Sequence, residues 1–371
     1  MNNYVKTYKG EFSKERLPLA AKIIYVMTIV TVVLHIISAF SADFADFFNR
    51  YISSALRFVL AHLTNYIPFS LAEALLLLLP VFAFLLIRYS IKNHSDSWRS
   101  VLIYMGSMLS VVCCFYILFF WSFGVGYNTT PLDRKLGLER NSVRYEELLE
   151  TAVILTEKVN EAASEVDFRE MNFSVMPYGI SELSDKLNDS YKKFNETNDI
   201  LAQLSSNLKP VMLSEAMSYT HITGVYTYFT GEANLNVNFP DYTLPFTAAH
   251  EFAHQRGISR EDEANFMAFL VCIGSDDPYI RYCGYLNVLE YVLNALYYVA
   301  PTIYPTVIQM IGTDVRNELN AYRNFFEKYQ NSVISRLSGS INDAYLKFNG
   351  TEGEISYGMV VDLAVAYYKE N

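Results

Sequence analysis

Two histidines one helical turn apart are the residues of this chain whose spacing most clearly predicts chemistry. His250, Glu251 and His254 form the pattern H-E-x-x-H. Side chains four positions apart lie on the same face of a helix, so both imidazoles can bind one zinc ion at about 2.0–2.1 Å. Glu251 can then take a proton from a water on the metal, as peptide hydrolysis requires. The alternative is a helix with two unrelated histidines, although chance would give this pattern in roughly one such chain in a hundred.

A catalytic zinc needs a third protein ligand, and no histidine follows His254. The carboxylates next along the chain are Glu261, Asp262 and Glu263. Glu261 shares a helical face with Asn265, whose amide could hydrogen-bond a ligand imidazole. Glu263 points about 200° away from Glu261 on that helix and suits an acidic helix start in solvent. We therefore predict Glu261 as the ligand, with Glu263 as the alternative.

A tyrosine beyond this second helix is a candidate for stabilising the transition state. Tyr282 could donate a hydrogen bond to a developing oxyanion, as could its neighbours Tyr279, Arg281 and Tyr285. The chain contains 29 tyrosines, so a role in packing is the competing interpretation for each of them.

The two motifs together resemble a known superfamily. H-E-x-x-H followed by E-x-x-A-N at Glu261–Asn265 is similar to the glutamate zincins, the thermolysin-like metallopeptidases. The resemblance implies zinc as the cofactor, Glu261 as its third ligand and Asn265 at the Asp/Asn position of the motif. Zincins often use a remote histidine near the transition state, which makes His221 a candidate; a lone structural histidine is the alternative.

A longer set of motifs resembles a bacterial family called domain of unknown function 3810. These motifs are TGEAN at 230–234, LPFT at 244–247, HEFAHQ at 250–255 and EDEANF at 261–266. Members of that family look like three membrane helices followed by a zincin domain, so the resemblance covers most of the chain. It implies a metallopeptidase-like site without naming a substrate. The segment Tyr357–Val361 also looks familial, with no role assigned.

Three apolar runs precede the motifs, and each is long enough to cross a bilayer, which takes about 20 helical residues. They cover residues 17–40, 67–87 and 101–123. The first is too long for a cleaved signal peptide. The amphipathic stretch at 51–66 suits an interfacial or re-entrant helix. The lipid bilayer is therefore an expected partner, and residues 1–123 are predicted to form a membrane anchor.

The basic residues predict the orientation of the anchor. They gather in the leader and in the second connection, at Lys6, Lys9, Lys14, Arg16, Lys22, Arg88, Lys92 and Arg99, and are sparse in the first connection. Positive-inside bias then places the remainder of the chain outside the cytoplasm. The family resemblance makes the membrane the cytoplasmic membrane of a bacterium. Residues 124–371 contain 33 acidic and 19 basic side chains, which argues against nucleic-acid binding.

The exported part is predicted to be a linker at 124–141 and a domain at 142–371. Apolar spacing predicts helices, and β-branched or alternating segments predict strands at Gly224–Gly231 and Leu235–Phe239. In zincins an edge strand pairs with substrate, which gives Leu235–Phe239 that candidate role; an ordinary covered strand is the alternative. The expected helices are 142–165, 181–208, 247–256 with Thr247 as cap, 259–273 capped by Ser259, 285–299, 315–337 and 357–368.

Two cysteines of this domain, Cys272 and Cys283, could form a disulfide in an oxidising compartment. Two separately buried thiols are the alternative. The expected fold class is mainly α, with three N-terminal transmembrane helices followed by an α+β zincin-like domain that has a small β-sheet beside the H-E-x-x-H helix.

The function predicted from these features is a membrane-anchored zinc metallopeptidase acting on a peptide or protein substrate, with Glu251 as general base. One alternative is a non-catalytic zinc-binding sensor or scaffold, although such a site has no use for Glu251. Another is a zinc hydrolase acting on a non-peptide amide. An intramembrane protease is disfavoured because Asp241, Gln255, Arg256 and Arg260 flank the motif closely.

Overall fold

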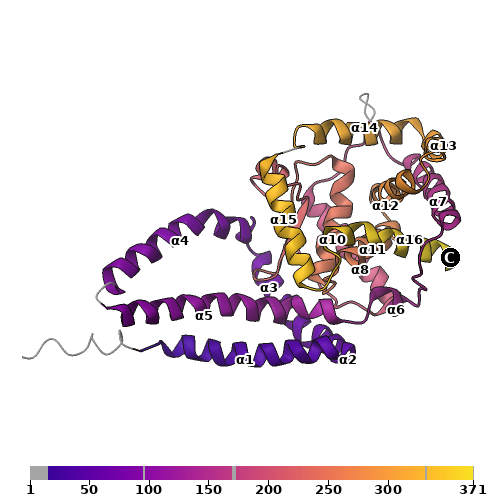
Figure 1. Cartoon of the computed structure of the whole chain (residues 1–371). Coiled ribbons are helices and arrows are strands. Elements are labelled where there is room, and N and C mark those ends of the chain that lie inside the picture. The colour runs from indigo at the N-terminus through magenta and orange to yellow at the C-terminus, as the bar shows by residue number, and fades with distance from the viewer. Residues whose placement is uncertain (1–15, 95–96, 169–172, 331, 371) are drawn as a thin grey trace, which may run out of the picture.

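The computed structural model describes residues 16–94, 97–168, 173–330 and 332–370. Lys6, Lys9 and Lys14, which entered the topology prediction, lie outside the described residues, as does the side chain of Tyr357. The chain is mainly helical, with one small three-stranded sheet. Long helices from the N-terminal third project to one side of a globular helical domain (Figure 1).

Three of these helices are long and apolar enough to cross a membrane. They are α1 (Leu19–Phe40), α4 (Leu71–His94) and α5 (Trp98–Ser122), so the three predicted spans are confirmed as candidate spans. Helices α1 and α5 lie side by side, whereas α4 diverges from them (Figure 1). Where α1 meets α5, the Trp121 indole donates a hydrogen bond to Thr31 at 3.0 Å.

The segment between the first two spans is helical and packs against the domain. It comprises α2 (Ala42–Phe47), a π-helical turn (Phe48–Ser53) and α3 (Ser54–Asn65). Arg57 of α3 is buried and donates to the Asn49 side chain and the Ser122 carbonyl, both at 2.8 Å. A charged group can be buried here because carbonyl and amide oxygens replace its water.

The chain after α5 also packs tightly rather than forming an exposed tether. Residues Gly124–Asn128 form a 3-10 helix and Leu132–Leu136 form α6. Val125 is fully buried, and Leu132 and Tyr127 are nearly so. This part of the predicted linker at 124–141 is therefore packed against the rest of the protein, although its composition is typical of turns.

The domain is built from further helices around one large hydrophobic core. Helix α8 (Ile180–Asn198) ends ten residues earlier than predicted, because Asp199 adopts a left-handed conformation (φ 47°) and the Asn195 side chain binds the Leu201 N–H. The predicted helix at 315–337 is wrong as a single element, since Ser332 caps a new helix there. The further helices of the domain are α7 (Tyr145–Ala163), α8 (Ile180–Asn198), α9 (Ser214–Ser218), α12 (Pro278–Val299), α13 (Tyr304–Met310), α14 (Thr313–Glu327), α15 (Val333–Phe348), a 3-10 helix (Gly353–Met359) and α16 (Val360–Glu370).

The sheet has the order β1-β3-β2. Strand β1 (Lys209–Pro210) is parallel to β3 (Glu232–Leu235), and β2 (Gly224–Thr227) is antiparallel to it. The prediction of a strand at Leu235–Phe239 is wrong, and its proposed role as a substrate-binding edge is wrong with it, because β3 is central.

The alternation that suggested this strand has another cause. Asn236 donates to the Ile222 carbonyl at 3.0 Å, and its side-chain oxygen accepts from the Asn238 N–H at 3.1 Å. These side-chain contacts bend the chain out of the ladder. Among the described residues, β2 is the strand of this sheet that lies at an edge near the H-E-x-x-H segment.

Candidate metal centre

The H-E-x-x-H segment lies on α10 (Leu244–Gln255), which is buried throughout. The helix begins three residues before Thr247, with Pro245 in the first turn, where a missing N–H costs nothing. It ends at Gln255, and Gly257 stops it as predicted, with φ 103°. Its N–H bonds the His254 carbonyl at 3.0 Å, and the Ile258 N–H bonds the Ala253 carbonyl at 3.1 Å. These two bonds are those of a Schellman turn.

The next helix, α11 (Glu261–Ile273), starts directly after this turn. Ser259 does not cap it as predicted. Its hydroxyl instead donates to the Phe123 carbonyl at 2.8 Å, and Arg260 occupies the cap position without a capping hydrogen bond from its side chain. The sharp turn folds α11 back onto α10, so Glu261, the first residue of α11, lies opposite the two histidines.

Glu261 meets both histidines through one oxygen. Its Oε2 lies 3.1 Å from Nε2 of His250 and 3.4 Å from Nε2 of His254. Potential ligand atoms of all three residues lie within 4.8 Å of one another. Around a tetrahedral zinc with bonds of about 2.1 Å, two ligand atoms are separated by about 3.4 Å. The observed spacing therefore fits a zinc ion held by these side chains.

The turn after α10 also orients one of the imidazoles. His254 Nδ1 lies 2.7 Å from the Ile258 carbonyl. A carbonyl can only accept, so Nδ1 carries a proton, and Nε2 is the ring nitrogen directed at the cluster. His250 Nδ1 is buried and has no hydrogen-bond partner among the described residues. Asn265 is buried beside the cluster, where its side chain hydrogen-bonds Tyr291.

Glu251 lies against strand β2. The Tyr226 backbone N–H donates a hydrogen bond to its carboxylate. A β-carbon at Gly224 would lie 2.6 Å from Oε1 of Glu251, so only glycine allows this approach. Oε2 of Glu251 is buried without a hydrogen-bond partner in the described structure. One oxygen can therefore be held by the strand while the other is available for a proton.

The environment separates the proton affinities of the two carboxylates. Burial raises the pKa of Glu251, and His250 and His254 oppose that rise only in part. Burial acts on Glu261 in the same direction, but the two imidazoles more than offset it and hold its pKa below the usual range. Burial lowers the pKa of His254, whereas Glu261 raises it to about 9 overall. Glu261 is thus the ionised partner and Glu251 the better proton acceptor.

The other carboxylates of α11 have partners outside the cluster. Glu263 accepts from the Arg260 guanidinium at 2.8 Å and from the Leu132 N–H at 3.0 Å. Asp262 pairs with Arg140 at 2.7 Å. Glu261 is therefore the member of this acidic run that faces the histidines.

Two predicted contact residues have their polar groups engaged elsewhere. His221 Nε2 lies 2.9 Å from the Tyr329 carbonyl, and its ring packs on Phe326. The Tyr282 hydroxyl donates to Glu318 at 2.6 Å.

The two cysteines of the domain do not form the disulfide considered above. Cys272 and Cys283 are both free, buried thiols.

Aromatic residues far away in the sequence complete the surroundings of the cluster. The Phe123 ring lies edge-on to His254 with centroids 5.5 Å apart. Phe123 also contacts Tyr127, whose hydroxyl lies 3.3 Å from that of Tyr345 on α15. Burial raises the pKa of Tyr345, and the charge of Glu261 adds to the rise. Sequence spacing gives no signal for these contacts, because they depend on how distant helices pack.

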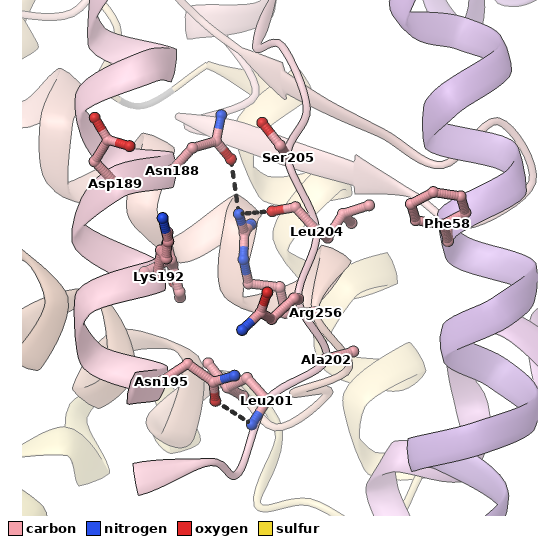
Figure 2. Close-up of a pocket in the computed structure, with 12 residues that line it drawn as sticks. Phe58, Asn188, Asp189, Lys192, Asn195, Leu201, Ala202, Leu204, Ser205 and Arg256 are labelled. Atoms are coloured by element: carbon pink, nitrogen blue, oxygen red, sulfur yellow. Dashed lines mark hydrogen bonds between the residues drawn. The ribbon is translucent and has the colours of Figure 1, made fainter. Parts of the chain in front are cut away.

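A cavity of about 300 Å³ lies between α3 and α8, at the C-terminal end of α10, and includes none of the three potential ligands (Figure 2). Arg256 reaches into its wall and bonds Asn188 Oδ1 at 2.8 Å and the Leu204 carbonyl at 2.6 Å. Its guanidinium also stacks over Tyr191. A cation at the C-terminal end of a helix is favourable, so this arrangement stabilises the end of α10.

Comparison with known protein families matches residues 44–365 to the family described as "Protein of unknown function (DUF3810)". No curated protein and no solved structure gives a significant match. The matched range begins in α2, ends in α16 and includes all of the residues of the cluster. The chain therefore belongs to the DUF3810 family.

Proposed function

We propose that this protein is a membrane-anchored, zincin-like zinc metallopeptidase that hydrolyses peptide bonds. The observation that supports the proposal best is the convergence of His250, His254 and Glu261, with nitrogen-to-oxygen distances of 3.1 and 3.4 Å. Glu251 lies beside them with one buried oxygen unpartnered.

The donor set of two imidazoles and one carboxylate suits zinc, and three protein ligands leave a fourth position open, as in catalytic zinc sites. When bound, zinc supplies a Lewis acid that lowers the pKa of water toward about 7. Glu261 contributes the negative charge, and the Ile258 carbonyl keeps the His254 lone pair directed inward.

Glu251 has the properties of a general base in this reaction. Its burial raises its pKa, which makes it a stronger proton acceptor than an exposed glutamate. The Tyr226 N–H fixes the orientation of the carboxylate. Glu251 would accept a proton from water during attack on the peptide carbonyl and then donate that proton to the departing amine. A purely structural zinc site has no need for such a residue.

The decisive experiment compares wild type with Glu251→Gln, using full-length protein in detergent and a mixture of internally quenched peptides. We expect chelator-sensitive cleavage by the wild type. We expect a loss of about 10²–10⁴-fold in the variant, the usual contribution of a general base. Both proteins should contain about one zinc per chain, because the three ligands are intact.

The outcomes separate the candidate functions. An active Glu251→Gln variant would rule out the proposed base. Zinc in both proteins without cleavage of any peptide would favour the sensor or scaffold, or a hydrolase of non-peptide amides. Absence of zinc from both would contradict the metal site itself.

We further propose that the membrane is the cytoplasmic membrane of a bacterium and that the metal centre lies outside the cytoplasm. Arg88 and Lys92 near the end of α4 and Arg99 at the start of α5 support this orientation, because Lys and Arg concentrate on the cytoplasmic side. A reporter fused after residue 371 should report an extracytoplasmic location, and one inserted between α4 and α5 a cytoplasmic location. The reverse pattern would overturn the orientation without affecting the chemistry.

A further inference from the structure

Helix α15 presents a continuous apolar face to its surroundings. Six of its large apolar side chains are between 38% and 84% exposed: Val333, Ile334, Leu337, Ile341, Tyr345 and Phe348. At 100° per residue, these positions and exposed Ala344 fall within an arc of about 120°. No polar residue lies in that arc. An exposed apolar surface of this size on a folded domain marks an interaction site.

The rest of the helix circumference has a different character. Ser335 and Leu346 lie on the opposite side and are buried against the domain. Arg336 and Lys347 are exposed on the flank beside the apolar arc. An apolar face with basic residues along its border is the pattern of helices that lie in a membrane interface.

Both ends of α15 are connected to ends of the candidate spans. At its C-terminal end, the Tyr345 ring contacts Phe119 in the last turn of α5, with centroids 6.2 Å apart. At its N-terminal end, the Ser332 hydroxyl donates to the Tyr219 carbonyl at 2.9 Å. Tyr219 directly follows the short helix α9.

The segment before α9 is in turn held by α4. The backbone N–H groups of Met212 and Leu213 both donate to Glu73, in the first turn of α4, at 2.8 Å. Met212 is 72% exposed, so the apolar surface continues beside the start of this span. In Figure 1, α15 runs across the end of α5 rather than along it.

We propose that the apolar face of α15 lies in the bilayer, within the leaflet on the metal-centre side. The argument for lipid as the occupant is continuity: α15 is fixed between the ends of two spans, so the bilayer surface that surrounds those ends reaches the same level. The side chains Leu337, Ile341 and Phe348 enter the leaflet. Arg336 extends to the phosphate layer, where long basic side chains are favoured, whereas Lys347 pairs with Asp343 at 2.7 Å.

This placement is independent of any catalytic activity. Tyr345, at the edge of the apolar arc, bonds Tyr127 and is close enough to Glu261 to feel its charge. The helix proposed to contact lipid is therefore linked to His254 through Tyr127 and Phe123.

The test places a spin label at single cysteines of the full-length protein in phospholipid nanodiscs. Leu337→Cys and Ile341→Cys lie on the apolar arc, and Ser340→Cys, exposed on the polar flank, is the matched control. Cys113 and Cys114 are replaced by serine; Cys272 and Cys283 are buried. Collision rates with oxygen and with a water-soluble nickel chelate report the surroundings of each label.

We expect the oxygen-to-nickel ratio at positions 337 and 341 to exceed that at 340 several-fold. Equally low oxygen-to-nickel ratios at the three positions would overturn the proposal, because the apolar face would then lie in water. Protection of 337 and 341 from both reagents would also overturn it, since a protein partner would then cover the face. Neither result depends on whether the protein hydrolyses peptides.

Discussion

Glu251 and Glu261, ten positions apart, lie in one cluster, but the pKa of Glu251 is raised and that of Glu261 is lowered. Burial alone would raise the pKa of both. The difference arises because Glu261 faces Nε2 of two imidazoles, while Glu251 faces a strand. The spacing of His250, Glu251 and His254 predicts the helix face they share. It leaves the choice of carboxylate open, because the choice depends on the turn at Gly257.

The choice between Glu261 and Glu263 can be tested by metal binding. Glu261→Gln removes a proposed ligand from the cluster, so we expect the protein's affinity for zinc to fall at least 100-fold, beyond the roughly 10–100-fold that loss of a supporting contact costs. Competition with a fluorescent zinc chelator measures the affinity of each protein for zinc. Glu263→Gln is the matched control: it keeps hydrogen-bonding groups toward Arg260 and Leu132 and should bind zinc like the wild type. Equal affinities for the two variants would contradict the assignment of Glu261.

At the scale of elements, two features position the site: the Schellman turn after α10 and the close approach of β2. The turn directs the Ile258 carbonyl to His254 and places Glu261 opposite. Gly224 brings the strand within reach of Glu251. Both features require glycine, at Gly257 for its positive φ and at Gly224 for space.

A β-carbon at Gly224 tests the second feature. Gly224→Ala would press on Glu251 and on Thr247, 2.9 Å away, and overpacking of this kind typically costs about 1–3 kcal/mol. We expect peptide hydrolysis to fall at least tenfold while the zinc content is unchanged, because the ligands lie on α10 and α11. Rates and metal content measured on one preparation give the answer.

Gly179→Ala provides the control for that substitution. Nothing lies within 4 Å of a β-carbon at this position, and its φ of −85° suits any residue. Its activity and stability should match the wild type. Full activity of Gly224→Ala would show that the strand need not approach Glu251 so closely.

Several elements could be predicted from the sequence because the apolar spacing of a helix is a local property. The spans and α7 follow this spacing closely. The end of α8 could not be predicted, because nothing in the local sequence shows that Asp199 adopts a left-handed conformation. The Leu235–Phe239 alternation was misleading because two asparagines, buried Asn236 and half-buried Asn238, produced it. The break before α15 carried one local signal, the capping residue Ser332.

At the scale of the whole molecule, the sheet of the domain is hydrogen-bonded to helix ends of the N-terminal part. Glu232 of β3 accepts from the first N–H groups of α4, at Leu71 and Ala72. Lys209 of β1 donates to the last carbonyls around α3, at Thr64 and Ile67. Charged side chains of the sheet thus satisfy helix ends in the membrane part. Such long-range contacts leave no pattern in a single sequence.

Arg57 tests how strongly the two parts depend on each other. Its guanidinium links α3 to Asn49 and to the end of α5, and a β-carbon at Gly257 would lie 2.5 Å from it. Arg57→Ala would leave a cavity and buried carbonyls without donors. We expect the free energy of unfolding to fall by about 2–4 kcal/mol, measured by denaturation in nanodiscs.

Arg50→Ala is the comparison for that variant. Arg50 forms an ion pair with Asp199 whose side chains are 34% and 81% exposed, and such a pair contributes under about 1 kcal/mol. Similar losses for the two variants would mean that the buried guanidinium adds little to the coupling between the parts.

The contact between Phe123 and His254 has a consequence for what can be cut. Phe123 directly follows the last residue of α5, so a single side chain separates a candidate span from a potential zinc ligand. If the proposed hydrolysis is correct, the metal centre lies close to the bilayer surface, so a peptide bond can be cut only if it reaches that surface. Chains tethered to the same membrane by a short stalk meet that condition, whereas bonds held high on a rigid ectodomain do not.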